Sequence, residues 1–185
     1  PFRRYNSFIP VNKFNLKYSY LIIFLLGLNF LKAQEDFSFP MLSPDGIVLQ
    51  KVGFTEIKLE YERPAARGRN IFGELVPWNE LWRTGAGNCT RISFSTQVKI
   101  NGSEIPAGTY SLFTIPNENE WMILLNTDTT LYGSYDHNPD KDIARFFVKP
   151  QKSSRFYESF TIDIDVVPEN AIIYLSWANT TVGFY

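Results

Sequence analysis

The sequence has very few of the side chains on which thiol, metal and histidine chemistry depend. Its 185 residues include one cysteine, Cys89, and one histidine, His137. A single cysteine excludes a disulfide within this chain, and one cysteine with one histidine argues against a typical zinc site. We expect Cys89 to be a buried, inert thiol and His137 to be a solvated residue of a turn rich in Asp, Asn and Pro. We predict no metal and no other cofactor.

Other sequence signatures of chemistry are also missing. The chain contains no P-loop, no G-x-G-x-x-G fingerprint and no G-x-S-x-G elbow that would mark a serine nucleophile. Asp136, Asp140 and Asp142 form an oxygen-rich cluster, but their spacing misses the EF-hand pattern. The sequence therefore predicts neither a nucleotide site nor a calcium site.

No apolar run is long enough to cross a bilayer as a helix. The main run, residues 18–31, follows a stretch with four basic residues and no acid, and Ala33 comes shortly after it. Its 14 residues would span about 21 Å as a helix, against about 30 Å for a bilayer core. We predict a cleaved secretory signal over residues 1–33, with an uncleaved anchor or a buried helix as alternatives. A short linker, 34–41, and a single domain, 42–185, would follow.

Removal of that segment changes the charge of the chain. The full sequence has 18 basic and 19 acidic residues, and all five charged residues before position 34 are basic, so the rest carries a net charge of −6. An acidic surface repels nucleic acid and anionic lipid, so we expect neither as a partner and no stable membrane insertion of the mature chain. We place this mature chain in the periplasm or outside the cell. Its oligomeric state is left open.

Strand patterns dominate the remainder of the chain. Residues 55–62 alternate strictly between apolar and charged side chains, and 47–52 is expected to pair with them across Gly53. Asn101-Gly102 is a strong hairpin signal. Further strands are predicted at 91–100, 109–115, 121–125, 143–148, 160–166, 171–177 and 181–184. Nine or ten short strands favour an all-β fold, an antiparallel sandwich or a barrel-like sandwich. One short helical turn is predicted at 77–82.

Three arginines lie within seven residues of one Pro- and Gly-rich loop. Arg63, Arg67 and Arg69 offer planar guanidinium forks that match carboxylate or phosphate oxygens, which is typical of an anion clamp. The alternative is structural, because arginine also fixes loops by binding backbone carbonyls or nearby acids. The acids near this loop are Glu60, Glu62, Glu74 and Glu80.

A second loop places an aromatic residue beside a cation. Trp82, Arg83 and Thr84 precede a run of small residues, a combination that suits a saccharide or other small polar ligand. The alternative is a loop that packs its tryptophan and arginine together to close one end of the sandwich. Because the two loops are close in sequence, their arginines are expected to lie side by side.

Several blocks of the chain, in order, resemble a family of exported bacterial proteins known only as a domain of unknown function, family 2911. The blocks are RPAARGRNIFGELVP at 63–77, LWRTGAG at 81–87, PAGTYSLFTIP at 106–116, EWMILLN at 120–126 and GSYDHNPDKDIAR at 133–145. The resemblance covers roughly residues 42 to 184. It implies a signal peptide, an all-β domain and no established activity. The chain departs from the pattern at Gly87, where Asn is more usual, and at His137, where Tyr is common.

Three functional hypotheses follow. The first is an exported, non-catalytic binding module for a small polar, anionic or saccharide-like ligand, or for an acidic segment of a partner, held by the two loops. The second is a carboxylate-dependent hydrolase of envelope glycans, in which acids from separate strands, such as Asp142 and Glu158, come together. Its candidate residues are Tyr110, Asp136, Asp142, Arg145 and Glu158. The third is a structural or assembly component without a small-molecule site.

Overall fold

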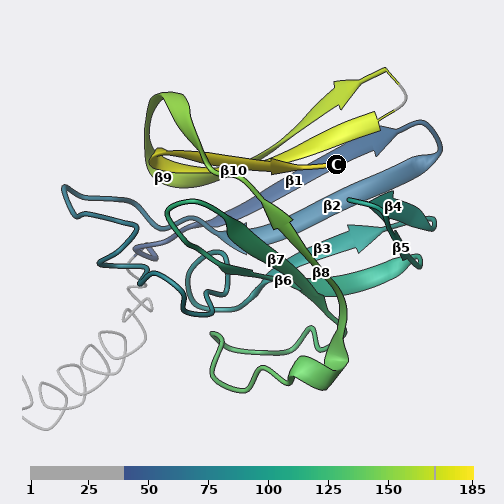
Figure 1. The fold of residues 1–185 in the computed structure, drawn as a ribbon, viewed down its shortest axis with the longest axis horizontal. Coiled ribbons are helices and arrows are strands. Elements are labelled where there is room, and N and C mark those ends of the chain that lie inside the picture. The colour runs from purple at the N-terminus through teal and green to yellow at the C-terminus, as the bar shows by residue number, and fades with distance from the viewer. Residues whose placement is uncertain (1–39, 169) are drawn as a thin grey trace, which may run out of the picture. The chain divides into compact units, whose positions relative to one another are not determined.

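Ten strands account for nearly all the regular structure of residues 40–168 and 170–185, which are the residues that this computed structural model describes (Figure 1). The predicted signal peptide and nearly all of the predicted linker lie outside them. Residues Met41–Tyr185 form one compact unit. Within the described ranges no helix has the length and apolar character needed to cross a membrane.

A six-stranded antiparallel sheet forms the larger layer. Its spatial order is β1-β2-β3-β6-β7-β8. The strands are β1 (Asp45–Val52), β2 (Thr55–Glu62), β3 (Thr90–Phe94), β6 (Gly108–Ile115), β7 (Trp121–Asn126) and β8 (Asp142–Val148). The predicted pairing across Gly53 is confirmed, because Val52 and Thr55 are register partners.

A long hairpin forms the second layer. It joins β9 (Gln151–Val167) to β10 (Asn170–Phe184). The register shifts between Ser176 and Thr180 of β10, because β9 has extra residues opposite this stretch. Figure 1 shows this hairpin curving over one face of the larger sheet. A small hairpin of β4 (Val98–Ile100) and β5 (Ser103–Ile105) turns at Asn101-Gly102, both in the left-handed region, as the sequence predicts. The all-β antiparallel architecture is confirmed.

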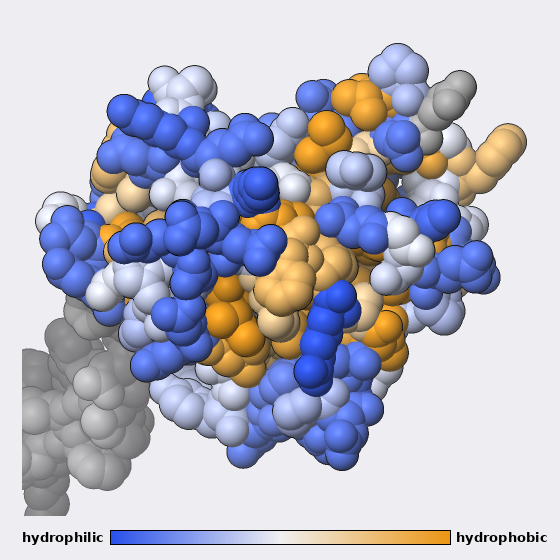
Figure 2. All heavy atoms as spheres, in the orientation of Figure 1, coloured by the Kyte–Doolittle hydropathy of each residue, from blue (hydrophilic) through white to orange (hydrophobic). Residues whose placement is uncertain are grey.

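Alternation along the strands explains the core. Leu59, Ile92, Leu112 and Leu125 are fully buried on the inner face of the larger sheet, where they join side chains of β9 and β10 such as Phe160 in one cluster. Such burial removes apolar surface from water, which stabilises the sandwich at about 25 cal/mol per Å². In the view of Figure 2, apolar side chains gather in the middle of the face, over the region of β7 and β8, and hydrophilic ones surround them.

Three predictions differ from the structure. Residues 171–177 and 181–184, predicted as separate strands, belong to one strand, β10. The predicted strand over 91–100 is interrupted, because residues 95–97 separate β3 from β4. The helical turn predicted at 77–82 is wrong. Asn79 has a φ of 62°, and the backbone N–H groups of Asn79 and Trp82 donate to the carbonyls of Pro116 and Thr114 rather than within a helical turn. The one short helix of the described residues is instead the 3₁₀ turn η1 (Pro139–Lys141).

The outer face of the larger sheet is partly covered by residues 127–138, which we call the outer loop. Leu131 of this loop packs against Cys89, Phe113 and Leu124 in a second, smaller apolar cluster. The expectation that Cys89 is buried is confirmed, and its Sγ lies 2.9 Å from Ser111 Oγ. The outer loop thus gives the sheet a cover on the side away from the hairpin.

Candidate functional site

The two arginine-bearing loops line one cavity of about 330 Å³, which we call the arginine pocket. Its lining includes residues from both loops and one from the outer loop, which the sequence did not suggest as a site residue. The polar and aromatic lining residues are Ser43, Arg69, Glu80, Trp82, Arg83, Ser134 and Trp177. The two loops therefore meet, as their closeness in sequence predicts.

Arg83 is the least satisfied side chain of this pocket. Its Nε is buried and has no hydrogen-bond partner among the described residues, and no ion pair there involves its guanidinium. The other buried side-chain atom in this condition is Trp121 Nε1, which lies inside the aromatic core. Buried polar groups are almost always paired, so an incompletely paired guanidinium on a residue that lines a cavity favours an anionic or carbonyl partner there.

Thr84 fixes the backbone beside Arg83 rather than lining the cavity. Its φ is 57°, a conformation that a β-branched residue rarely adopts, and its side chain is fully buried. The Thr84 hydroxyl donates to Thr114 Oγ1 at 3.2 Å, and the Thr84 carbonyl accepts from Thr90 Oγ1 at 2.6 Å. Strain of this kind persists only where the surroundings hold it, and it often accompanies functional loops.

Trp82 belongs mainly to the core. It is 8% exposed, it stacks on Trp177 at 5.9 Å between ring centroids, and Phe160 meets it edge-on at 5.1 Å. Its Nε1 donates to the carbonyl of Gly85 at 3.0 Å. A sugar ring needs an open aromatic face on which to stack, and these contacts leave Trp82 little of one. Trp82 is therefore better placed to set the floor of the pocket than to hold a saccharide.

The other three arginines are tied to the protein to different degrees. Arg63 donates to the Phe160 carbonyl and to Thr161 Oγ1. Arg67, with a φ of 50°, donates to the Leu42 carbonyl and does not line the pocket. Arg69 lines the pocket, but its Nε and Nη2 donate to the carbonyls of Ala66 and Ala65. Arg63 and Arg67 therefore fix the loop, as the structural alternative predicts. Arg69 does so only in part, because it also lines the pocket.

The residues of the alternative acid–base cluster lie in four places. Asp142 and Arg145 are together, with Arg145 Nη2 2.8 Å from Asp142 Oδ2. Tyr110 donates its hydroxyl proton to the Pro106 carbonyl, and Glu158 accepts a hydrogen bond from the backbone N–H of Arg67. Asp136, the remaining candidate, is exposed on the outer loop. The five residues therefore do not share one site, and Asp142 and Glu158 have separate partners.

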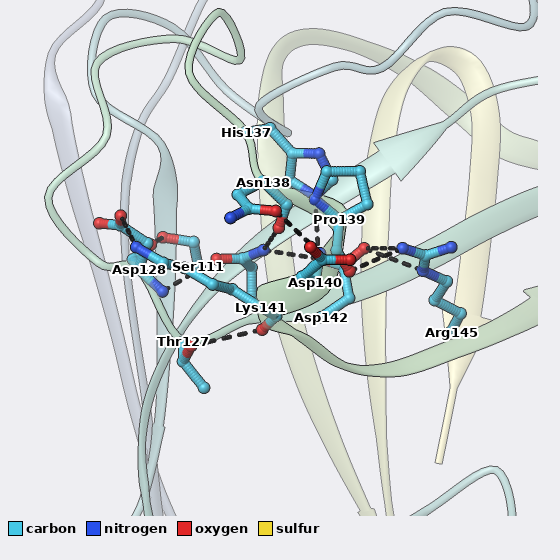
Figure 3. A network of polar contacts seen from close by, with 11 residues as sticks. Ser111, Thr127, Asp128, His137, Asn138, Pro139, Asp140, Lys141, Asp142 and Arg145 are labelled. Atoms are coloured by element: carbon cyan, nitrogen blue, oxygen red, sulfur yellow. Dashed lines mark hydrogen bonds and ion pairs between the residues drawn. The ribbon is translucent and has the colours of Figure 1, made fainter.

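Figure 3 shows that Asp142 is the centre of a polar network at the end of the outer loop. Its carboxylate accepts hydrogen bonds from Asn126 Nδ2 at 2.6 Å and Arg145 Nε at 2.9 Å, and it meets His137 Nε2 at 2.8 Å. The expectation of a solvated His137 is wrong. The imidazole is buried between this carboxylate and the ring of Phe113, because the outer loop folds back onto the sheet.

Metal ligation finds no support in the described ranges. They contain no group of three or more His, Cys, Asp or Glu side chains placed to hold an ion. Asp142, which belongs to the Asp cluster noted in the sequence, already has Asn126, His137 and Arg145 as partners. The polar network is therefore an anchor of the loop rather than an open coordination site.

Comparison with known proteins identifies the family but adds no activity. Neither a search of the curated proteins nor a search of the solved structures gave a match. A family model described as protein of unknown function, DUF2911, matches residues 43–185, nearly the whole of the compact unit. The chain belongs to the DUF2911 family.

Proposed function

We propose that this chain is an exported, non-catalytic binding module that holds a small anionic ligand, a carboxylate or a phosphate, in the arginine pocket. The observation that carries the proposal is the Arg83 guanidinium, whose Nε is buried without a partner among the described residues. A planar oxyanion in the pocket would give the Arg83 guanidinium a partner in the bidentate geometry that guanidinium favours.

The surroundings of Arg83 suit a small anion. Arg69 adds a second positive charge to the lining, Glu80 a single negative one, and Ser134 a hydroxyl. Two of the five N–H donors of Arg69 are used on carbonyls, so others remain for a ligand. A volume of about 330 Å³ lies at the lower end of the range for ligand pockets. These features favour a small anion over a saccharide, because the faces of Trp82 are covered.

Export is part of the proposal and rests on the sequence. The basic stretch, the short apolar run at 18–31 and the small residue Ala33 are the three parts of a secretory signal. No specific observation favours the glycan hydrolase, because its five candidate residues do not share a site. A binding module therefore accounts for the most features of the chain.

The test compares Arg83 with a matched arginine of the same region. Binding of phosphate, sulfate and succinate to the full chain is measured by calorimetry, together with the thermal midpoint. Arg83→Ala should weaken binding of the preferred anion by about tenfold or more, the value of one charge-assisted pair. Arg67→Ala removes the same charge outside the pocket and should leave affinity within about threefold.

The unliganded stability of the variants separates binding from structure. Arg83→Ala should change the free energy of unfolding by less than about 1 kcal/mol, because the guanidinium has no described partner to lose. An equal loss of affinity in both variants would show that the arginines act through the net charge of the protein and not through contact with the ligand. Unfolding of Arg83→Ala, or the absence of saturable binding for all three anions, would refute the proposal.

A further inference from the structure

A second cavity, of about 450 Å³, lies on the outer face of the larger sheet, and we call it the acidic cavity. Strands β1, β2 and β3 form its base, and residues 129–131 of the outer loop form a wall. The lining residues that matter here are Asp45, Ile47, Glu60, Glu62, Arg91 and Thr130. It shares no lining residue with the arginine pocket, so it is a separate site.

Glu62 is a buried carboxylate without a cation. It ends β2 on the polar side of the strand, yet the residue is only 8% exposed. Among the described residues, its carboxylate accepts one hydrogen bond, from the backbone N–H of Asn88 to Oε1 at 3.1 Å. No Lys, Arg or His side chain of the described residues forms an ion pair with it. A buried carboxylate is strongly disfavoured unless a positive group or several hydrogen bonds compensate for lost hydration.

The loop after Trp82 encloses Glu62 without neutralising it. Gly87 has a φ of 51°, and a Cβ at this position would overlap both carboxylate oxygens of Glu62. Glycine thus lets the backbone pass directly over the carboxylate. Glu62 also lines the acidic cavity, so a ligand there could supply the missing positive charge.

A second unpaired acid faces Glu62 across the strands. Asp45 is its direct register partner in the antiparallel pair of β1 and β2, so both side chains project from the same face. Like charges directly opposite each other destabilise a sheet. By contrast, Glu60 on the same face is paired with Lys58 at 3.0 Å and Arg91 at 3.6 Å. The arrangement neutralises Glu60 and leaves two facing carboxylates without a described counter-ion.

We propose that the acidic cavity binds the ammonium group of a small organic amine, with Glu62 as its buried counter-ion and Asp45 as a second. The three N–H donors of an ammonium match two carboxylates and the hydroxyl of Thr130. Ile47 and Leu131 add apolar lining for a short alkyl chain. A divalent metal is a poorer fit, because the described residues offer no group of three metal-ligating side chains.

The experiment titrates butylammonium chloride into the full chain and follows binding by calorimetry and by the amide signal of Asn88. Glu62→Gln should weaken binding by about tenfold or more, and Asp45→Asn by a smaller factor, as expected for a buried and an exposed charge partner. The control is Glu104→Gln on β5, an acid that does not line the cavity, which should keep the wild-type affinity.

The stability of Glu62→Gln separates ligand binding from a structural role. Glutamine keeps an oxygen for the Asn88 N–H and removes the charge that faces Asp45, so the thermal midpoint should stay level or rise. If Glu62→Gln unfolds, the test rests on Asp45→Asn, because Asp45 is exposed. Unchanged butylammonium affinity of Asp45→Asn would then overturn the proposal. Three other results would overturn the proposal: the absence of saturable butylammonium binding, an equal loss of affinity in Glu62→Gln and Glu104→Gln, or displacement of butylammonium by calcium. Anion binding at Arg83 should be unaffected by Glu62→Gln, which keeps the two sites distinguishable.

Discussion

Replacing Asp142 by alanine should loosen the outer loop and lower the stability of the whole domain. The carboxylate is fully buried and accepts hydrogen bonds from Asn126 and Arg145, with His137 2.8 Å from Oδ1 (Figure 3). Alanine leaves the histidine without a buried partner. It also frees Arg145, whose side chain is 48% exposed and can be solvated again.

The expected magnitude follows from these partners. The contacts with Asn126 and His137 contribute about 1 kcal/mol each. The Arg145 pair is discounted to about 1 kcal/mol because Arg145 is half exposed and screened by solvent. A loss of about 3 kcal/mol in the free energy of unfolding corresponds to a thermal midpoint lower by about 6–12 °C in a domain of this size.

The assay is urea unfolding of the full chain, combined with amide hydrogen exchange. Exchange should rise first in the outer loop and only later in β6 and β7, because local opening needs less free energy than global unfolding. The control is Asp140→Ala in the same segment, whose side chain is exposed and should change stability by less than about 0.5 kcal/mol. A loss below about 1 kcal/mol for Asp142→Ala, or equal effects of both variants, would refute the view of Asp142 as the loop anchor.

Two further predictions concern the loops around the cavities. Gly87→Ala should cost about 2 kcal/mol in urea unfolding, since it combines a left-handed φ with overlap on Glu62, and pairing it with Glu62→Ala should relieve part of the loss. A hydrogen bond from Lys141 is the main cause that lowers the pKa of Asp128 below its ordinary value of 3.8. The stabilisation from Asp128 is therefore full above its unfolded pKa and is lost as the pH falls through the lower folded value. Lys141→Ala should raise that folded pKa in a carboxyl NMR titration, and an unchanged titration would contradict the assignment.

Local patterns explain why so much of the fold was predictable. Strict alternation over β2 specifies a strand with one buried face, and Asn101-Gly102 specifies a left-handed turn, because both depend on neighbouring residues alone. The segment 77–82 has the composition of a helix start, but Thr114 of β6 and Pro116 just after it accept hydrogen bonds from its N–H groups. A tertiary hydrogen bond of that kind has no local signature.

The candidate site was predictable only in part, for a similar reason. The spacing of the arginines indicates that the two loops can meet, and the arginine pocket contains Arg69 and Arg83 from one loop each. The sequence does not show which donors backbone carbonyls will use, as for Arg63. Alternation also assigned Glu62 to a wet face, because it describes the strand and not the loop that later covers that face.

The outer loop connects these observations, because it contributes to both cavities. Thr129, Thr130 and Leu131 line the acidic cavity, while Ser134 lines the arginine pocket from the same segment. The end of the loop is held by the Asp142 network (Figure 3), which lines neither cavity. A buried anchor that touches no ligand can therefore set the shape of two oppositely charged sites. On this reasoning Asp142 is a positioning residue, and its loss should weaken anion and amine binding together, whereas Arg83 and Glu62 variants each affect one site.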